Sequence, residues 1–164
     1  RSGEQARPVD SPLAHVDRLV ALGRLDEART ALEQMIAANP SSAVGHDRLG
    51  FVLGKQGATA DAIQEFRRAV ALNPKLADAQ YHLGATLWWT KDIDGARQAL
   101  EAAVKLRPSH AESRYYLGLT KRQQGDVAGA MVDLRAAVKV NPSLAVAHMQ
   151  LGVALQESDA IAPS

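Results

Sequence analysis

Four prolines divide this chain at one constant interval. Each follows an asparagine or an arginine, and each lies 34 residues after the one before: Pro40, Pro74, Pro108 and Pro142. Self-similarity at a period of roughly 20 to 50 residues is typical of solenoids, propellers and other repeat architectures. The period therefore constrains the fold of these 164 residues more strongly than any single motif does.

The blocks between the prolines share residues at matching positions. We number each block from the third residue after its proline, so that position one is Ala43, Ala77, Ala111 or Ala145. Position seven is leucine and position eight is glycine in all four of these blocks. Positions twenty and twenty-seven are alanine wherever a block reaches them, as at Ala62 and Ala69. One structural unit is therefore repeated along the chain.

Each block predicts two helices separated by a turn. The first, helix A, covers about positions one to fourteen, and the second, helix B, covers about positions eighteen to thirty. The segments "KQGAT", "TKDID" and "QQGDV" supply the turns, and the proline stops helix B. Small residues at positions eight, twenty and twenty-seven let the two helices approach closely. We expect four aspartates that lie near the starts of helices B to cap them: Asp26, Asp92, Asp94 and Asp126.

The pattern resembles the tetratricopeptide repeat. That family has Leu-Gly at positions seven and eight, followed by alanine, a large apolar residue, alanine and proline on the same period. Phe66, Leu100 and Leu134 hold the large apolar position here. The resemblance covers about residues 9–158. It implies an all-α fold, a right-handed superhelical solenoid of antiparallel helix pairs with about four and a half repeats.

The same resemblance divides the chain into three parts. These are a flexible N-terminal segment at residues 1–8, a repeat array at residues 9–158 and a tail at residues 159–164. The repeats are residues 9–42, 43–76, 77–110 and 111–144, followed by helix A of a fifth repeat at residues 145–158. Position four, usually a large aromatic residue in the family, is polar at His46, Gln80, Arg114 and His148. Position eleven is leucine except at Lys121, which predicts weaker packing in the fourth repeat.

Most aromatic residues fall on the side of helix A that faces away from helix B. At about 100° per residue, positions four, seven, eight and eleven face helix B. Positions two, five, six, nine, twelve and thirteen lie on the opposite side, and six of the seven aromatic residues occupy them. In the family this side lines the concave groove of the superhelix. The resemblance therefore implies an aromatic groove.

We expect this groove to bind a peptide or protein segment, because exposed apolar patches and Trp, Tyr and Arg side chains mark interfaces. The predicted lining residues are Phe51, Tyr81, Ala85, Trp88, Trp89, Tyr115, Tyr116, Leu119 and Arg122. The predicted charges at its margins are Asp47, Arg48, Lys55, Asp78 and Glu112. Two alternatives stay open: the rings pack on one another, or residues 1–10 fold back into the groove.

Helix A of the fifth repeat ends the pattern with an apolar surface. It carries few charges, and its apolar residues include Met149, Leu151, Val153 and Leu155. The favoured interpretation is a piece cut from a longer array, whose next helix would cover this surface. The alternatives are self-association into a homo-oligomer, which would make the chain a self-assembling structural scaffold, and the interaction domain of a larger multidomain enzyme.

The remaining signals predict a scaffold that is not an enzyme. The chain has no cysteine, and its five histidines lack metal-ligand spacing, so we predict no catalytic residue, metal or cofactor. A net charge of +1 without a basic run argues against nucleic acid as a partner. No apolar run is long enough for membrane insertion. A cytoplasmic location is favoured, and a periplasmic or secreted one after signal removal stays open.

Overall fold

The computed structural model describes residues 11–162 and contains helices but no strand within that range. The helices are α1 (Pro12–Ala21), α2 (Leu25–Ala38), α3 (Ala43–Lys55), α4 (Thr59–Leu72), α5 (Ala77–Trp89), α6 (Ile93–Leu106), α7 (Ala111–Gln123), α8 (Val127–Val140) and α9 (Ala145–Ile161). The odd-numbered helices are the predicted helices A, and the even-numbered helices are the predicted helices B.

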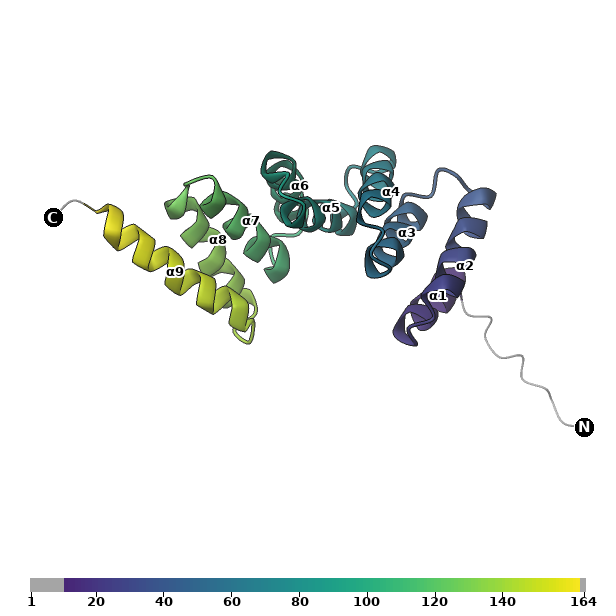
Figure 1. The fold of residues 1–164 in the computed structure, drawn as a ribbon, viewed down its shortest axis with the longest axis horizontal. Coiled ribbons are helices and arrows are strands. Elements are labelled where there is room, and N and C mark those ends of the chain that lie inside the picture. Colours follow the sequence, from purple (N-terminus) through teal and green to yellow (C-terminus); the bar gives the residue numbers. More distant parts are fainter. Residues whose placement is uncertain (1–10, 163–164) are drawn as a thin grey trace, which may run out of the picture.

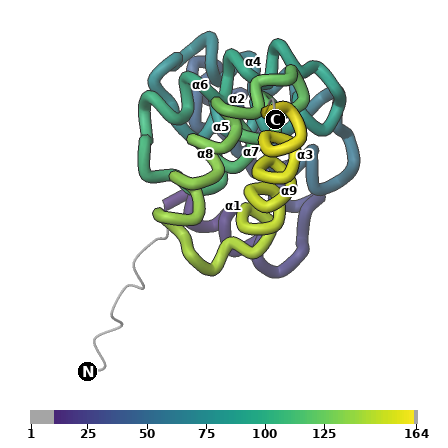
Figure 2. The backbone as a smooth tube through the Cα atoms, turned by 90° about the vertical axis from the view of Figure 1, so that its left-hand side faces the viewer, coloured from purple at the N-terminus to yellow at the C-terminus, as the bar shows by residue number. Residues whose placement is uncertain are grey.

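Neighbouring helices pair, and the pairs follow one another along one axis (Figure 1). Helices α3, α5 and α7 each pack most extensively on the helix B of their own repeat. Seen along the array from the α9 end, the pairs stack one behind another (Figure 2). The prediction of an all-α solenoid of antiparallel helix pairs is therefore confirmed.

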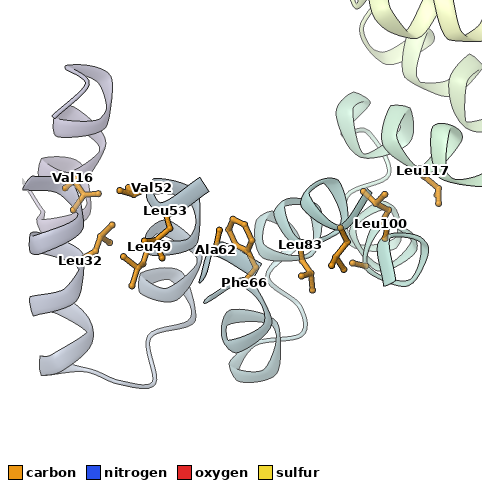
Figure 3. Packing of buried hydrophobic residues seen from close by; sticks show 14 of the residues in the cluster. Val16, Leu32, Leu49, Val52, Leu53, Ala62, Phe66, Leu83, Leu100 and Leu117 are labelled. Atoms are coloured by element: carbon orange, nitrogen blue, oxygen red, sulfur yellow. The ribbon is translucent and has the colours of Figure 1, made fainter. Parts of the chain in front are cut away.

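The glycine at position eight sets the distance between helices A and B. A Cβ atom added at Gly84 would lie 2.5 Å from the Cγ atom of Leu100, far inside van der Waals contact. The corresponding distances are 2.7 Å from Gly50 to the Phe66 ring and 2.8 Å from Gly118 to Leu134. The large residue of helix B therefore lies directly on the backbone of helix A. Repetition of this contact builds one cluster of buried apolar side chains that extends from Val16 in α1 to Leu117 in α7 (Figure 3).

The polar side chain at position four stabilises the turn between repeats through a hydrogen bond. In each repeat its side chain hydrogen-bonds the carbonyl oxygen of the proline six residues earlier. His46 is 2.9 Å from the Pro40 oxygen, and Gln80 donates to the Pro74 oxygen at 3.1 Å. These carbonyl groups would otherwise lack a protein partner at the helix start. The departure from the family's aromatic residue therefore has a structural role.

The fourth repeat replaces an apolar contact with a buried ion triad. Asp133, with 2% of its side chain exposed, accepts from Arg114 at 2.8 Å and from Lys121 at 2.7 Å. The neighbouring Leu117 and Leu134 remain fully packed. The prediction of weaker packing around Lys121 is therefore wrong, because that lysine satisfies a buried carboxylate instead of leaving a gap.

Two of the four predicted capping residues are confirmed. Asp92 and Asp126 cap α6 and α8, each accepting from a backbone N–H three residues on. The prediction is wrong for Asp26 and Asp94. Those two carboxylates lie inside the first turn and accept from the side-chain amides of Gln56 and Gln124 in the next repeat. Helix α6 therefore has a local cap from Asp92, whereas α2 has no side-chain cap.

Helix α9 continues to Ile161, beyond the predicted end at residue 158. Residues 159–161 are therefore helical rather than part of a tail. The predicted flexible segment at residues 1–8 and the possible return of residues 1–10 into the groove lie outside the described residues. Among the helices that the structure describes, none is long and apolar enough to cross a membrane.

Candidate functional site

The surface that we call the inner face consists of the sides of α3, α5 and α7 that face away from their helices B. Helices α3, α5, α7 and α9 contact one another in succession, whereas no comparable contact joins α4, α6 and α8. The spacing between repeats is therefore smaller on the helix A side. An array whose repeats are closer on one side curves toward that side, so the inner face is the concave one.

A hollow of about 360 Å³ opens beside the inner face between α3 and α5, and Thr59 and Phe66 of α4 also form part of its wall. We call it the inner hollow. Its wall includes five residues predicted from the sequence: Phe51, Lys55, Tyr81, Ala85 and Trp89. The small residues Gly54 and Ala85 leave the space that the large rings surround. The tertiary structure thus brings residues of two repeats together around one apolar depression.

The two adjacent tryptophans have different environments. Trp89 is 65% exposed and donates from its Nε1 atom to the Tyr116 hydroxyl at 3.2 Å. Trp88 is half-buried and packs against the core, and its ring lies edge-on to Trp89 with the centroids 5.0 Å apart. The Nε1 atom of Trp88 is shielded and has no acceptor among the described residues. Trp89 is therefore the ring that is presented to solvent.

Behind Trp89, four other rings pack on one another. Tyr116 lies 5.8 Å from Trp88, 6.2 Å from Tyr81 and 5.1 Å from Tyr115, measured between ring centroids. Burial, with smaller effects from Tyr116 and Glu112, raises the pKa of Tyr81 to about 12. Burial also raises the pKa of Tyr115. The interpretation that the rings pack on one another therefore holds for this cluster, which supports Trp89 from behind.

Two predicted site residues are buried. Asp47 is 3% exposed and accepts a hydrogen bond from His82 of the next repeat at 2.8 Å, so it is not a charge at the groove margin. Leu119 is 7% exposed and cannot offer a lining surface. Both predictions are wrong for one reason: the side opposite helix B also contacts helix A of the neighbouring repeat.

Position six is the contact that sequence reasoning missed. Its side chain reaches back to the preceding repeat in every case: Arg48 to Asp17, His82 to Asp47, Tyr116 to Trp89 and Gln150 to Arg122. The sequence contains one signal for this contact: position six of the second to fifth repeats always has a side chain that can form a hydrogen bond. The arrangement fixes His82 at the wall of the inner hollow and Tyr116 under Trp89.

Two lysines lie over aromatic rings at the C-terminal ends of α3 and α5. The Nζ atom of Lys55 lies 5.2 Å from the centroid of Phe51, and that of Lys91 lies 5.0 Å from the centroid of Trp88. A cation over a ring at an exposed site contributes about 0.5–1 kcal/mol. Lys91 was not predicted as a site residue.

Lys91 also has an unusual backbone conformation. Its φ of 68° is left-handed, and the equivalent turns of the other repeats have glycine there: Gly23, Gly57 and Gly125. A residue with a Cβ atom costs about 1 kcal/mol more than glycine in this conformation. Strain of this size is typical of positions kept for a reason other than stability. The lysine that it places over Trp88 is therefore a candidate functional residue.

The opposite margin carries two acidic side chains, of which one is paired with a cation. Asp78 accepts from Arg107 at 3.0 Å, and Glu112 lies 3.5 Å from His110. Burial lowers the pKa of His110, so this histidine tends to be neutral and does not balance the charge of Glu112. The C-terminal margin carries Arg122, which lies 3.5 Å from Glu157. Acidic side chains thus lie at the N-terminal ends of α5 and α7, and basic side chains lie at the C-terminal ends of α3 and α7.

Helix α9 exposes the side that the other helices A cover with a helix B. A Cβ atom added at Gly152 would meet no atom within 4 Å, unlike the three earlier glycines at position eight. Met149 and Leu155 are exposed, and Leu151 and Val153 are partly buried. This apolar side of α9 is a second candidate interaction surface.

No group of His, Cys, Asp or Glu side chains in the described part of the chain could hold a metal ion. Several polar groups of the inner face form hydrogen bonds between repeats, such as that of His82 with Asp47 and that of Trp89 with Tyr116.

Comparisons with known proteins agree on the architecture. Two family models, both described as tetratricopeptide repeat, match residues 13–77 and 55–119. A crystal structure of MamA is 25% identical, with a TM-score of 0.79, and the alignment covers 88% of this chain and 84% of MamA. No curated protein matches the chain in sequence.

Two further solved structures share the fold at lower identity. PilF of Pseudomonas aeruginosa is 22% identical, with a TM-score of 0.82, over 92% of this chain and 68% of that one. YrrB, described as a tetratricopeptide repeat protein with an unusual peptide-binding site, is 21% identical, with a TM-score of 0.78, over 90% of this chain and 76% of that one. At these identities the likeness extends to the fold alone.

Proposed function

This chain belongs to the tetratricopeptide repeat family of protein-interaction scaffolds, and on that premise we propose that it binds a peptide segment of a partner protein on its inner face. The observation that carries the proposal is the inner hollow between α3 and α5, with the exposed Trp89 at its wall. Tryptophan is enriched among the residues that contribute most of the binding free energy at interfaces, and such residues cluster in apolar pockets.

In the proposed mechanism, one apolar side chain of the ligand enters the inner hollow. It packs between Phe51 and Trp89, with Ala85 as the floor. Burial of this apolar surface provides most of the binding free energy. The scaffold contributes rigidity, because Tyr116 holds Trp89 and Asp47 holds His82 before any ligand arrives. A preformed site loses less conformational entropy on binding.

In this proposal the site does not catalyse a reaction. Its rings and cations recognise a ligand, and the protein acts as a non-catalytic scaffold. MamA and YrrB support a scaffold through their shared fold, and YrrB's description names a peptide-binding site. The open, shallow hollow favours modest affinity, because the buried area is small.

The test compares the two tryptophans. Peptides selected from a random displayed library against the intact chain would be measured against Trp89→Ala and Trp88→Ala by fluorescence anisotropy. We expect Trp89→Ala to weaken binding about 30-fold, the size of a typical hot spot, with little change in unfolding. Trp88→Ala should instead cost about 2 kcal/mol of stability, because part of its ring is core.

Val132→Ala, on the exposed surface of α8, is the control and should leave peptide binding unchanged. Undiminished binding of the selected peptides to Trp89→Ala would show that the inner hollow is not the binding site.

A second candidate function is self-association, favoured by the open surface at Gly152. In the second, third and fourth repeats a large residue of helix B lies on the equivalent glycine. On α9 no described residue covers this surface, which could receive α9 of a second copy. Two antiparallel α9 helices related by a two-fold axis would approach closely at Gly152 and bury Leu151 and Leu155. A contact between single helices is small, so we propose a weak dimer.

Sedimentation velocity over a range of concentrations tests this second proposal. Leu155→Glu should abolish dimer formation, whereas Val132→Glu, on the exposed surface of α8, should not affect it. A monomer at every concentration would rule out self-association through α9.

A further inference from the structure

The basic margin of the inner face carries two cations that have no carboxylate partner. Within residues 11–162, neither Lys55 nor Lys91 lies within 4.0 Å of an acidic side chain, and both are exposed. Instead, each lies over an aromatic ring beside the inner hollow. The contact with the ring restricts the ammonium group but leaves its hydrogen-bond donors free for another acceptor.

The nearby carboxylates of the chain are already engaged. Asp92 caps α6 and lies 3.9 Å from Arg67. Asp94 accepts from Gln124, and Glu157 pairs with Arg122. Among residues 11–162, no carboxylate therefore forms an ion pair with either lysine at this margin.

Lys91 provides an independent observation. Its backbone conformation is left-handed, and glycine occupies the equivalent position in the other three turns of this kind. Only in the repeat that contains the paired tryptophans does a cation stand at this position, directly over Trp88. The turn itself does not need the lysine, so the side chain rather than the backbone accounts for the residue.

We infer that the ligand of the inner face is an acidic segment, with one apolar side chain in the inner hollow and flanking carboxylates on Lys55 and Lys91. The inference rests on the proposed peptide binding at the same face. Lys55 lines the hollow, and Lys91 lies over Trp88, whose ring contacts the lining residue Trp89. One cation therefore belongs to the wall of the hollow, and the other is linked to that wall through the contact between the two tryptophan rings. Basic residues beside the apolar side chain of the ligand would instead be repelled by the two lysines.

The test uses three peptides that share a central phenylalanine and differ only in their flanks, which are glutamate, glutamine or lysine. Binding to the intact chain is measured by anisotropy and by tryptophan fluorescence at low and high salt. We expect the glutamate peptide to bind most tightly and to lose its advantage in high salt. Lys55→Gln and Lys91→Gln should each weaken that peptide about two- to fivefold and leave the glutamine peptide unchanged.

Lys139→Gln, at an exposed site near the end of α8, is the matched control and should have no effect. Equal affinity for the glutamate and glutamine peptides, or tighter binding of the lysine peptide, would overturn the inference while leaving peptide binding intact. Failure of all three peptides to bind would overturn both the inference and the proposed function.

Discussion

The same substitution should have opposite effects at equivalent positions of two repeats. Gly84 and Gly152 both occupy position eight in the middle of a helix A. Gly84 is covered by Leu100 of α6, whereas Gly152 has no helix B against it. Replacement by alanine adds one methyl group at each site. The comparison therefore isolates the contribution of the helix B contact from that of helix propensity.

The expected changes in the free energy of unfolding follow from the distances around each glycine. At Gly84 the new Cβ atom would lie 2.5 Å from Leu100 Cγ and 3.1 Å from the Leu100 backbone nitrogen. Leu100 is fully buried and cannot turn away, so overpacking should cost about 1–3 kcal/mol. Alanine regains about 0.5–1 kcal/mol through its helix propensity. The expected net loss for Gly84→Ala is about 1–2 kcal/mol. Gly152→Ala should gain about 0.5–1 kcal/mol, because nothing opposes the propensity term.

Urea unfolding followed by two probes would measure these values. Circular dichroism at 222 nm reports the whole array, whereas tryptophan fluorescence reports α5, which contains Gly84 and both tryptophans. In thermal unfolding, Gly84→Ala should lower Tm by about 3–6 °C and Gly152→Ala should raise it by about 1–3 °C. The measurements belong at low protein concentration, so that a dimer through α9 does not contribute.

A loss of stability in Gly152→Ala comparable to that in Gly84→Ala would refute the reasoning. It would mean that another part of the protein covers Gly152. A gain in Gly84→Ala would equally refute it, because the α5–α6 contact would then be loose enough to accept a methyl group.

Three further predictions concern the buried triad, the strained turn and pH. Asp133→Ala should cost about 2–3 kcal/mol in urea unfolding, because it leaves Arg114 and Lys121 partly buried without a counter-charge; replacing all three by the Gln, Leu and Ala of the third repeat should restore stability. Lys91→Gly should stabilise the chain by about 0.5 kcal/mol, as relief of the left-handed strain exceeds the lost ring contact. Stability should fall as pH rises from about 10 to 12, because the folded chain holds the Tyr81 proton that the unfolded chain releases; phenolate absorbance would locate the titration.

The repeat period allowed much of the architecture to be predicted. The leucine, glycine and alanine positions define the contact between helix A and helix B, and both helices lie within one repeat of the same short segment. Local rules of periodicity and close packing therefore apply, as the contact of Gly50 with Phe66 shows. The predicted helices and their pairing were confirmed for this reason.

The inner face depended on contacts that cross from one repeat to the next. Asp47 lies on the predicted side of α3, but His82 of the following repeat buries it. Trp88 and Trp89 are neighbours in sequence, yet the packing of α7 against α5 supports one ring and leaves the other exposed. A helical wheel gives the direction of a side chain and not what lies in front of it. The sequence by itself determined which residues face away from helix B. Only the tertiary structure decided which of them remain open to a ligand, because the next helix A covers part of the same surface.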